Sequence, residues 1–173
     1  MQEVFRLTKS EDNLKAAFAG ESQANRKYLA FAEKADKEGF SQVAKLFRAA
    51  AAAETVHAHN HLRVLGEIKS TAENLKQAIG GEHHEFTSMY PGFIKDAESE
   101  GNKEAIRTFN LANEVEKIHH KLYEKALDSV NGGKDLPGTD IFICPVCGYT
   151  HESKPPEKCP VCGAAGKVFK KVD

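Results

Sequence analysis

The chain has 173 residues, with 24 Lys and Arg against 25 Asp and Glu and a formal net charge of −1. This balance excludes a basic field for nucleic acid and an acidic tail. No stretch approaches the ~20 apolar residues of a membrane span, and the N-terminal sequence MQEVFRLTKSEDN has no apolar run typical of a targeting signal. These features predict a cytoplasmic protein, large enough for one buried domain and a small appendage.

Capping residues and glycines bound the first two predicted helices. Residues 8–11 read Thr-Lys-Ser-Glu, a capping box that opens the first helix, and Gly39 ends it. Ser41 can cap the second helix, which Gly66 ends. The richness of this region in Ala, Glu, Lys and Leu favours helix throughout.

Capping residues and glycines also bound the third and fourth helical stretches. A second capping box begins at Ser70. Gly80-Gly81 is expected to interrupt the third stretch, leaving a short helix at about 71–79 and a long one at about 82–100. The fourth stretch then runs to Gly132-Gly133. Residues 1–131 are therefore predicted to form a four-helix bundle.

Each of these helical stretches carries a glutamate in the apolar stripe that should face the core. The four are Glu21, Glu54, Glu82 and Glu116. Isolated buried charges are costly and are normally avoided or paired. Because no Lys or Arg lies near them on these stripes, a metal is the expected counter-charge.

Two of these glutamates begin a Glu-x-x-His motif, at Glu54–His57 and Glu116–His119. Residues i and i+3 share a helix face, so each pair can hold a metal from one helix. Glu21 precedes Glu54 by 33 residues and Glu82 precedes Glu116 by 34, which indicates an internal repeat of two helix pairs. One such motif is usually a solvated helix face, but two with matching upstream glutamates are typical of di-iron or di-manganese bundles.

Two roles, support of the metal site or packing in the core, remain open for three other residues. Tyr28 and Tyr123 each lie seven residues after one of these glutamates, and could hydrogen-bond a metal ligand or simply pack in the core. His61 lies one turn beyond His57 and could support the site or be a core histidine. The remaining helical histidines are expected at the surface or rim: His59, His83, His84 and His120.

The C-terminal part contains all four cysteines of the chain. Residues 132–140 are a turn-rich linker, and residues 141–173 form a small module with two Cys-Pro-Val-Cys-Gly knuckles. Two such knuckles predict a tetrahedral site of four sulfurs, which zinc and iron both accept. Disulfides are disfavoured in a reducing compartment. Short strands are expected around the metal at Ile141, Phe142, Ile143, Val168 and Phe169.

The whole chain resembles rubrerythrins. The matching stretches are AFAGESQANRKYLAFAEKADKEGF, AAAETVHAHNH, GGEHHEFTSMYPGF, NEVEKIHHKLY and the two knuckles. The resemblance implies an all-α, ferritin-like four-helix bundle (1–131), a linker (132–140) and a rubredoxin-like domain of short β-strands (141–173). The implied di-iron ligands are Glu21, Glu54, His57, Glu82, Glu85, Glu116 and His119. The implied ligands of a single iron are Cys144, Cys147, Cys159 and Cys162.

The resemblance also implies an activity and partners. The activity is indirect NADH-linked reduction of hydrogen peroxide to water in oxidative-stress defence, with the four-cysteine iron re-reducing the di-iron site. The electron donor would be a rubredoxin or an NAD(P)H-dependent reductase. The implied assembly is a homodimer, with exchanged helices in some members, in which the cysteine iron of one chain faces the di-iron pair of the other. The short linker with Pro137 is expected to limit folding back along the chain's own bundle.

Charge counting is compatible with a redox role. Five carboxylates and two ferrous ions sum to −1, and two ferric ions with one oxide also sum to −1, so two electrons can leave without unbalancing the core. Two other functions remain open at this point. One is a ferroxidase or iron-storage protein, which has no need of an electron-carrying module. The other is a non-catalytic bundle with a zinc ribbon.

Overall fold

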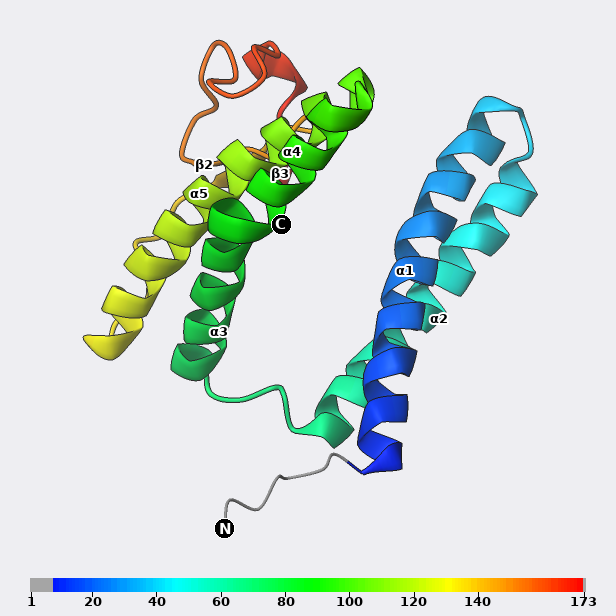
Figure 1. The fold of residues 1–173 in the computed structure, drawn as a ribbon, viewed down its shortest axis with the longest axis horizontal. Helices are drawn as coiled ribbons and strands as arrows, with labels where there is room; N and C mark the ends of the chain where they lie inside the picture. The colour runs from blue at the N-terminus through cyan, green and yellow to red at the C-terminus, as the bar shows by residue number, and fades with distance from the viewer. Residues whose placement is uncertain (1–7, 173) are drawn as a thin grey trace. The chain divides into compact units, whose positions relative to one another are not determined.

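The structure is a computed structural model that describes residues 8–172. Residues 1–7 and 173, and with them much of the N-terminal stretch considered above, lie outside the described residues. The chain divides into two compact units that meet in sequence between Lys69 and Ser70. The predicted class is confirmed: the fold is mostly helical with a small C-terminal sheet (Figure 1).

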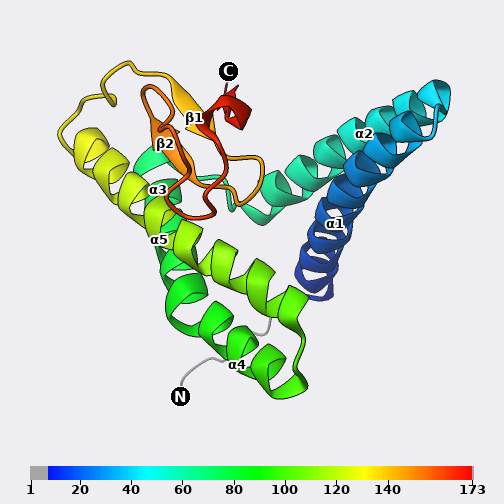
Figure 2. The same ribbon diagram turned by 90° about the horizontal axis from the view of Figure 1, so that it is seen from above.

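The first unit is an antiparallel hairpin of α1 (Lys9–Lys37) and α2 (Ser41–Leu65), which lie side by side in Figures 1 and 2. Small buried residues, Ala32, Ala35 and Ala44, line the contact and allow the two backbones to approach closely. The capping box at Thr8 is confirmed. Ser41 is the first helical residue and not the cap, since Phe40 occupies that position without a side-chain cap bond.

The helices of the second unit are α3 (Thr71–His84), a π-helical segment (Glu85–Met89), α4 (Tyr90–Glu100) and α5 (Lys103–Asn131). The first three form one continuous helical stretch, against which α5 packs. The predicted interruption at Gly80-Gly81 is wrong, because α3 runs through both glycines. A glycine costs a helix only about 1 kcal/mol, which tertiary packing can offset. The irregularity lies further on, in the π-helical segment.

The internal repeat inferred from the glutamates extends to an aromatic cluster in each unit. The clusters are Tyr28, Phe31 and Phe47 in the first unit and Tyr90, Phe93 and Phe109 in the second. Their ring centroids lie 6.3, 6.2 and 5.6 Å apart in the first cluster and 6.3, 6.2 and 5.6 Å apart in the second. The two helix pairs therefore share this aromatic packing as well as their sequence spacing.

The π-helical segment absorbs one extra residue of the second copy. Glu21 precedes Tyr28 by seven residues, whereas Glu82 precedes Tyr90 by eight. The segment Glu85–Met89 lies between the latter two. A π-turn takes in one residue more than an α-turn, so Glu82 keeps the position relative to the aromatic cluster that Glu21 has. This also accounts for the 33- and 34-residue intervals.

The cysteine module (residues 141–173) contains an antiparallel sheet in the order β2-β1-β3, made of β1 (Ile141–Ile143), β2 (Thr150–Glu152) and β3 (Lys170–Val172). The strand expected at residues 141–143 is confirmed. Val168 ends a short 3-10 turn (Gly166–Val168) and Phe169 precedes β3, so the strand expected at these two residues is displaced. Figures 1 and 2 both show the module beside α5.

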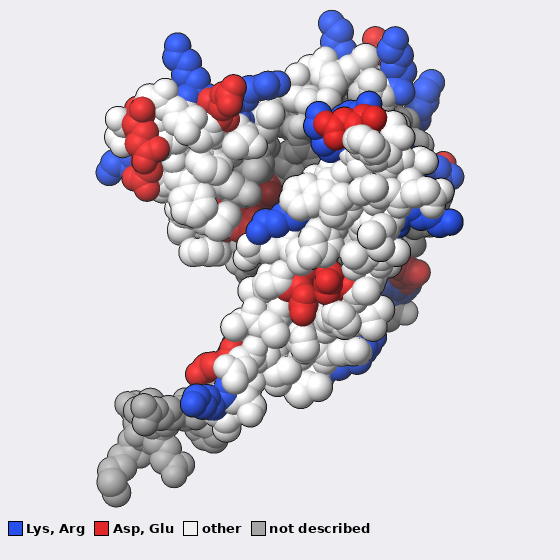
Figure 3. All heavy atoms as spheres, turned by 90° about the vertical axis from the view of Figure 1, so that its right-hand side faces the viewer, with Lys and Arg blue, Asp and Glu red and all other residues white. Residues whose placement is uncertain are grey.

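The surface carries charges of both signs. On the face drawn in Figure 3, acidic and basic side chains are interspersed among larger uncharged areas, as the near-zero net charge predicts. Among the described residues, every helix is too short or too polar to cross a bilayer.

Candidate metal centres

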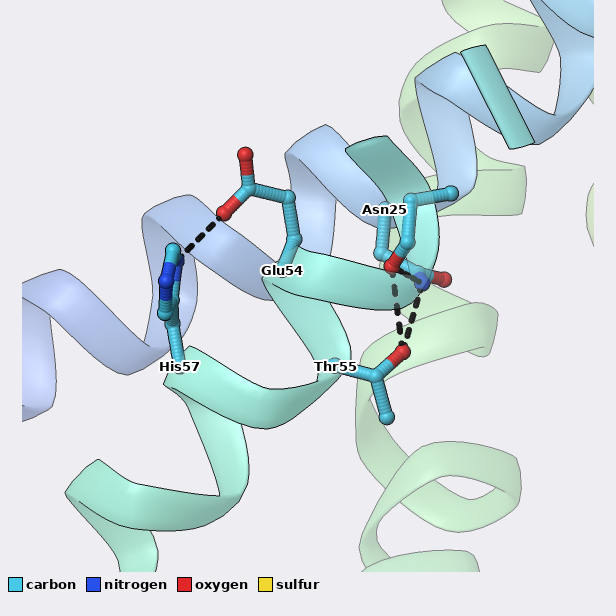
Figure 4. Close-up of polar contacts among 5 residues, drawn as sticks. Asn25, Glu54, Thr55 and His57 are labelled. Carbon is cyan, nitrogen blue, oxygen red and sulfur yellow. Dashed lines mark hydrogen bonds and ion pairs between the residues drawn. The ribbon is translucent and has the colours of Figure 1, made fainter. Parts of the chain in front are cut away.

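The first unit brings together Glu21, Glu54 and His57, whose ligand atoms lie within 4.8 Å of one another. This trio is called half-site 1. The His57 Nδ1 atom lies 2.8 Å from Glu54 Oε2, as expected of residues one turn apart on α2 (Figure 4). The His57 side chain is 54% exposed and that of Glu54 18%. One helical hairpin thus supplies two carboxylates and an imidazole at one place.

A buried amide lies behind half-site 1. Asn25, one turn after Glu21 on α1, donates from Nδ2 to the Ala51 carbonyl oxygen at 2.7 Å and to Thr55 Oγ1 at 2.9 Å (Figure 4). Asn25 is 7% exposed. These bonds tie α1 to α2 next to Glu54. They fix the register between the helix that carries Glu21 and the helix that carries the Glu-x-x-His motif.

The second unit brings together Glu82, Glu116 and His119 within the same 4.8 Å limit. This trio is called half-site 2. The His119 Nδ1 atom lies 2.8 Å from Glu116 Oε2 and 3.9 Å from Glu82 Oε1. Burial raises the pKa of Glu82 to about 7, and its hydrogen bond with Glu116 and the negative charges of Glu116 and Glu85 add to this. Clustered carboxylates of this kind are stabilised by a cation.

Glu85 lies at the start of the π-helical segment, near half-site 2 but outside its innermost trio. Burial raises the pKa of Glu85, and the negative charge of Glu116 acts in the same direction. The Glu85 carboxyl group therefore lies within electrostatic range of half-site 2. The structure therefore brings the predicted seventh ligand to the edge of half-site 2. The widened turn of the π segment gives this position its place on the helix.

Two tyrosines adjoin half-site 2. Burial raises the pKa of Tyr90 and of Tyr123, and in both cases the charges of Glu82 and Glu116 raise it further. Both phenols therefore remain protonated at neutral pH and can donate hydrogen bonds. The sequence interpretation missed Tyr90 and paired Tyr28 with Tyr123. The aromatic clusters show that the counterpart of Tyr28 is Tyr90, which an interval of 62 residues could have revealed.

The four cysteines form the predicted cage. The Sγ atoms of Cys144 and Cys162 are 3.6 Å apart, as are those of Cys147 and Cys159. A metal about 2.3 Å from four tetrahedral sulfurs requires them to lie about 3.8 Å apart, so the cage fits a bound ion. Burial raises the pKa of the Cys147 thiol. The pKa of Cys159 is lowered although burial opposes this, because the backbone amides of Cys162 and Val161 donate to its sulfur.

The cysteine module packs against α5 of its own chain, contrary to the expectation from the short linker. Gly148 adjoins Val115, and a Cβ atom on Gly148 would lie 3.7 Å from Val115 Cγ1. Lys125 Nζ and Glu152 Oε2 form an ion pair of 2.6 Å. The linker residues therefore return the chain along the helix that they follow.

Comparisons with known proteins agree with this arrangement. Residues 12–127 match the sequence profile of rubrerythrins, and residues 142–170 match that of the rubrerythrin rubredoxin-like domain. The chain belongs to the rubrerythrin family. Rubrerythrin-2 of Clostridium acetobutylicum is 39% identical over 91% of this chain and 94% of its own length. Nigerythrin of Nitratidesulfovibrio vulgaris is 39% identical over 87% of this chain and 80% of its own.

Solved structures of nigerythrin also match. The fully reduced, all-ferrous state covers 99% of this chain and 90% of its own, with 34% identity and a TM-score of 0.57. The partially reduced state matches with 35% identity, the same coverage and a TM-score of 0.56. As a rubrerythrin, the chain carries the family's cofactors, a di-iron site and a four-cysteine iron site, as the sequence analysis expected. The Glu and His groups and the sulfur cage suit these ions.

Proposed function

We propose that this rubrerythrin is a non-haem iron peroxidase that reduces hydrogen peroxide to water and acts in oxidative-stress defence. The observation that carries the proposal is the pair of half-sites, each with two carboxylates and one imidazole, in a chain that also holds a four-sulfur cage. The first arrangement suits a pair of iron ions. The second suits a single iron that carries one electron at a time.

The proposed di-iron ligands are the seven residues expected from the sequence: Glu21, Glu54, His57, Glu82, Glu85, Glu116 and His119. When bound, two ferrous ions would supply the two electrons that, with two protons, convert one hydrogen peroxide into two water molecules. Each half-site would supply two carboxylates and one imidazole to these ions. The proposed boundaries remain 1–131, 132–140 and 141–173.

The protein's own part is to position groups and to handle protons. Tyr90 and Tyr123, protonated beside half-site 2, can donate hydrogen bonds to a ligand carboxylate or to bound peroxide. A cavity of about 270 Å³ is lined by residues that include His119, Tyr123 and Thr150. It is large enough to admit hydrogen peroxide. Its walls are mostly apolar, among them Leu75 and Leu122, which would limit the water around the site.

The proposed electron donor is a rubredoxin or an NAD(P)H-dependent reductase, which would deliver electrons to the four-cysteine iron. The proposed assembly is a cytoplasmic homodimer, with or without exchange of the first helical hairpin. Transfer between chains was expected from the resemblance. The packing of the module on its own α5 favours transfer within one chain into half-site 2.

The function is tested with protein reconstituted anaerobically with iron. Fully reduced protein is mixed with known amounts of hydrogen peroxide, and the loss of peroxide is followed together with the visible absorption of the ferric four-cysteine site. We expect one peroxide consumed for every two electrons and a red colour that bleaches on reduction. Steady-state turnover should require an added reductase and NADH.

Other outcomes point to the alternative functions. Oxidation of many added ferrous ions per chain, with growth of a large mineral-containing particle, would identify an iron-storage protein. A colourless four-cysteine site filled with zinc, with no peroxide consumption by iron-loaded bundle, would identify a non-catalytic metal-stabilised protein. Either result would overturn the proposal.

A further inference from the structure

The first knuckle of the cysteine module and β2, which follows it, lie beside α5. Val146 shares a surface hollow with Thr108 and Leu111. Gly148 adjoins Val115.

The next contact in this series reaches a proposed iron ligand. Thr150 Oγ1 lies 2.9 Å from His119 Nε2. After it, Glu152 pairs with Lys125 at 2.6 Å. Half-site 2 therefore has a side-chain contact with the cysteine module, and Thr150 lies only three residues after Cys147.

The Thr150 hydroxyl has a second hydrogen-bond partner. Its hydroxyl donates to the Gly148 carbonyl oxygen at 3.2 Å, so the same oxygen is left to accept. It can therefore accept the hydrogen of His119 Nε2. A neutral imidazole protonated at Nε2 has its lone pair at Nδ1, and this Nδ1 atom faces Glu116 and Glu82.

Among residues 8–172, half-site 1 has no equivalent of this contact. His57 Nδ1 faces Glu54 with the same 2.8 Å separation. Within the part of the chain that the structure describes, however, no hydrogen bond is made by His57 Nε2, and the side chain is 54% exposed against 27% for His119. The hydroxyl contact is thus an addition specific to the half-site that adjoins the cysteine module.

We infer that Thr150 is a positioning residue for half-site 2: it fixes His119 as the Nε2-protonated tautomer and so presents Nδ1 to a metal. The cysteine module then docks on α5 and prepares His119 of half-site 2 for metal binding in one event, within one chain. The inference rests on the proposed function only in taking His119 as a metal ligand. Hydrogen bonds of this kind commonly change metal affinity 10- to 100-fold.

The test uses full-length protein loaded with Zn²⁺, which is diamagnetic and accepts imidazole and carboxylate ligands. Histidine is labelled with ¹⁵N, and NMR reports the tautomer of His119 and the exchange of its Nε2 proton with water. Thr150→Val keeps the shape and removes the hydroxyl, whereas Thr150→Ser keeps the hydroxyl. Competition with a chelator measures the Zn²⁺ affinity of the carboxylate and histidine ligands.

In the unsubstituted protein we expect a slowly exchanging Nε2 proton on His119 and a metal-shifted Nδ1. Thr150→Val should speed this exchange and weaken Zn²⁺ binding about 10- to 100-fold, and Thr150→Ser should restore both. Glu152→Gln, which weakens the ion pair with Lys125 and leaves His119 untouched, is the control for docking alone. It should leave the Nε2 proton protected.

Three results would overturn the inference. One is unchanged exchange and affinity in Thr150→Val. Another is an equal loss in Thr150→Val and Thr150→Ser, which would indicate packing and not the hydroxyl. The third is an equal loss in Glu152→Gln, which would indicate docking alone. If the zinc-loaded protein gives the expected NMR signals but the iron-loaded protein consumes no peroxide, the result would count against the proposed function and not against the role of Thr150.

Discussion

The two half-sites are copies of one design that differ in what surrounds them. In half-site 1, regular α-helices carry the ligands, and a buried amide, Asn25, ties the helices together. In half-site 2, a π-helical segment adds Glu85, and Thr150 holds the outer nitrogen of His119. The inner geometry is the same in both, with 2.8 Å from histidine Nδ1 to glutamate in each. Half-site 2 thus has two neighbouring groups, Glu85 and Thr150, without a counterpart at half-site 1 among the described residues.

The largest expected effect comes from breaking the cysteine cage with Cys144→Ser. A module of this size depends on its metal to fold, so the red colour should be lost and donor-driven turnover should fall at least about 100-fold. Hydrogen exchange should increase in α5 around Val115 and His119, where the module packs. Unchanged exchange in α5 would contradict the view that the folded module stabilises the helix on which it packs.

The next comparison uses the matched variants Glu54→Ala and Glu116→Ala. Because each glutamate lies 2.8 Å from its own histidine, either change should reduce bound iron and lower peroxide turnover about 100-fold, the upper end of effects seen for outer groups. Metal analysis and stopped-flow kinetics measure both. Full activity in one variant would show that its half-site is not part of the centre.

Co-expression of these two variants also tests whether the two half-sites of one metal centre come from the same chain or from two chains. If a centre takes half-site 1 from one copy and half-site 2 from another, isolated heterodimers contain one intact centre and should recover about half of the activity per dimer. If each chain supplies its own two half-sites, both centres remain broken and no activity returns.

A smaller effect is expected from Asn25→Ala, which removes two hydrogen bonds and leaves a small cavity between α1 and α2. The expected cost is about 1–3 kcal/mol in the free energy of unfolding, measured by urea denaturation. Asn110→Ala is the control, since Asn110 is exposed and bonds only the Ile106 carbonyl within its own helix. A similar loss in both variants would mean that Asn25 does not have a special role in joining the hairpin.

The smallest expected effect is the pH dependence of the metal-free protein. The pKa of Glu82 is raised from 4.5 to about 7, so the folded state binds more protons than the unfolded state between these values. Stability should therefore fall as pH rises from about 4.5 to about 7. Glu82→Gln should flatten this dependence in thermal melts. A metal-free protein that gains stability across this interval, equally in both variants, would contradict the assignment to Glu82.

The sequence was sufficient for the features that depend on local spacing. Gly66, with positive φ, ends α2 as expected, and the helix expected to end at about residue 100 ends there, before Gly101. The Glu-x-x-His motifs and the cysteine knuckles come together as their spacing predicted, because residues one turn apart on a helix, or on one tight loop, have little freedom. The full set of di-iron ligands stays a prediction.

The features that were missed depend on contacts distant in sequence or on competition between hydrogen-bond patterns. Thr150 meets His119 across 31 residues, and no periodicity encodes such a contact. Gly80-Gly81 was expected to break a helix, yet packing against α5 keeps α3 continuous. The π segment differs from an α-helix by one residue in one turn, which is visible only by comparing intervals between the two copies.

This π segment has a consequence for how the chain can change by mutation. Inserting one codon into an α-helix normally rotates everything beyond it by about 100° and misdirects the buried side chains. Here the extra residue is confined to a single turn, and Tyr90, Phe93 and Phe109 pack as their counterparts do in the other copy. A helix that tolerates such an insertion can gain a carboxylate beside the proposed metal centre, here Glu85, in one genetic step while its core packing is retained.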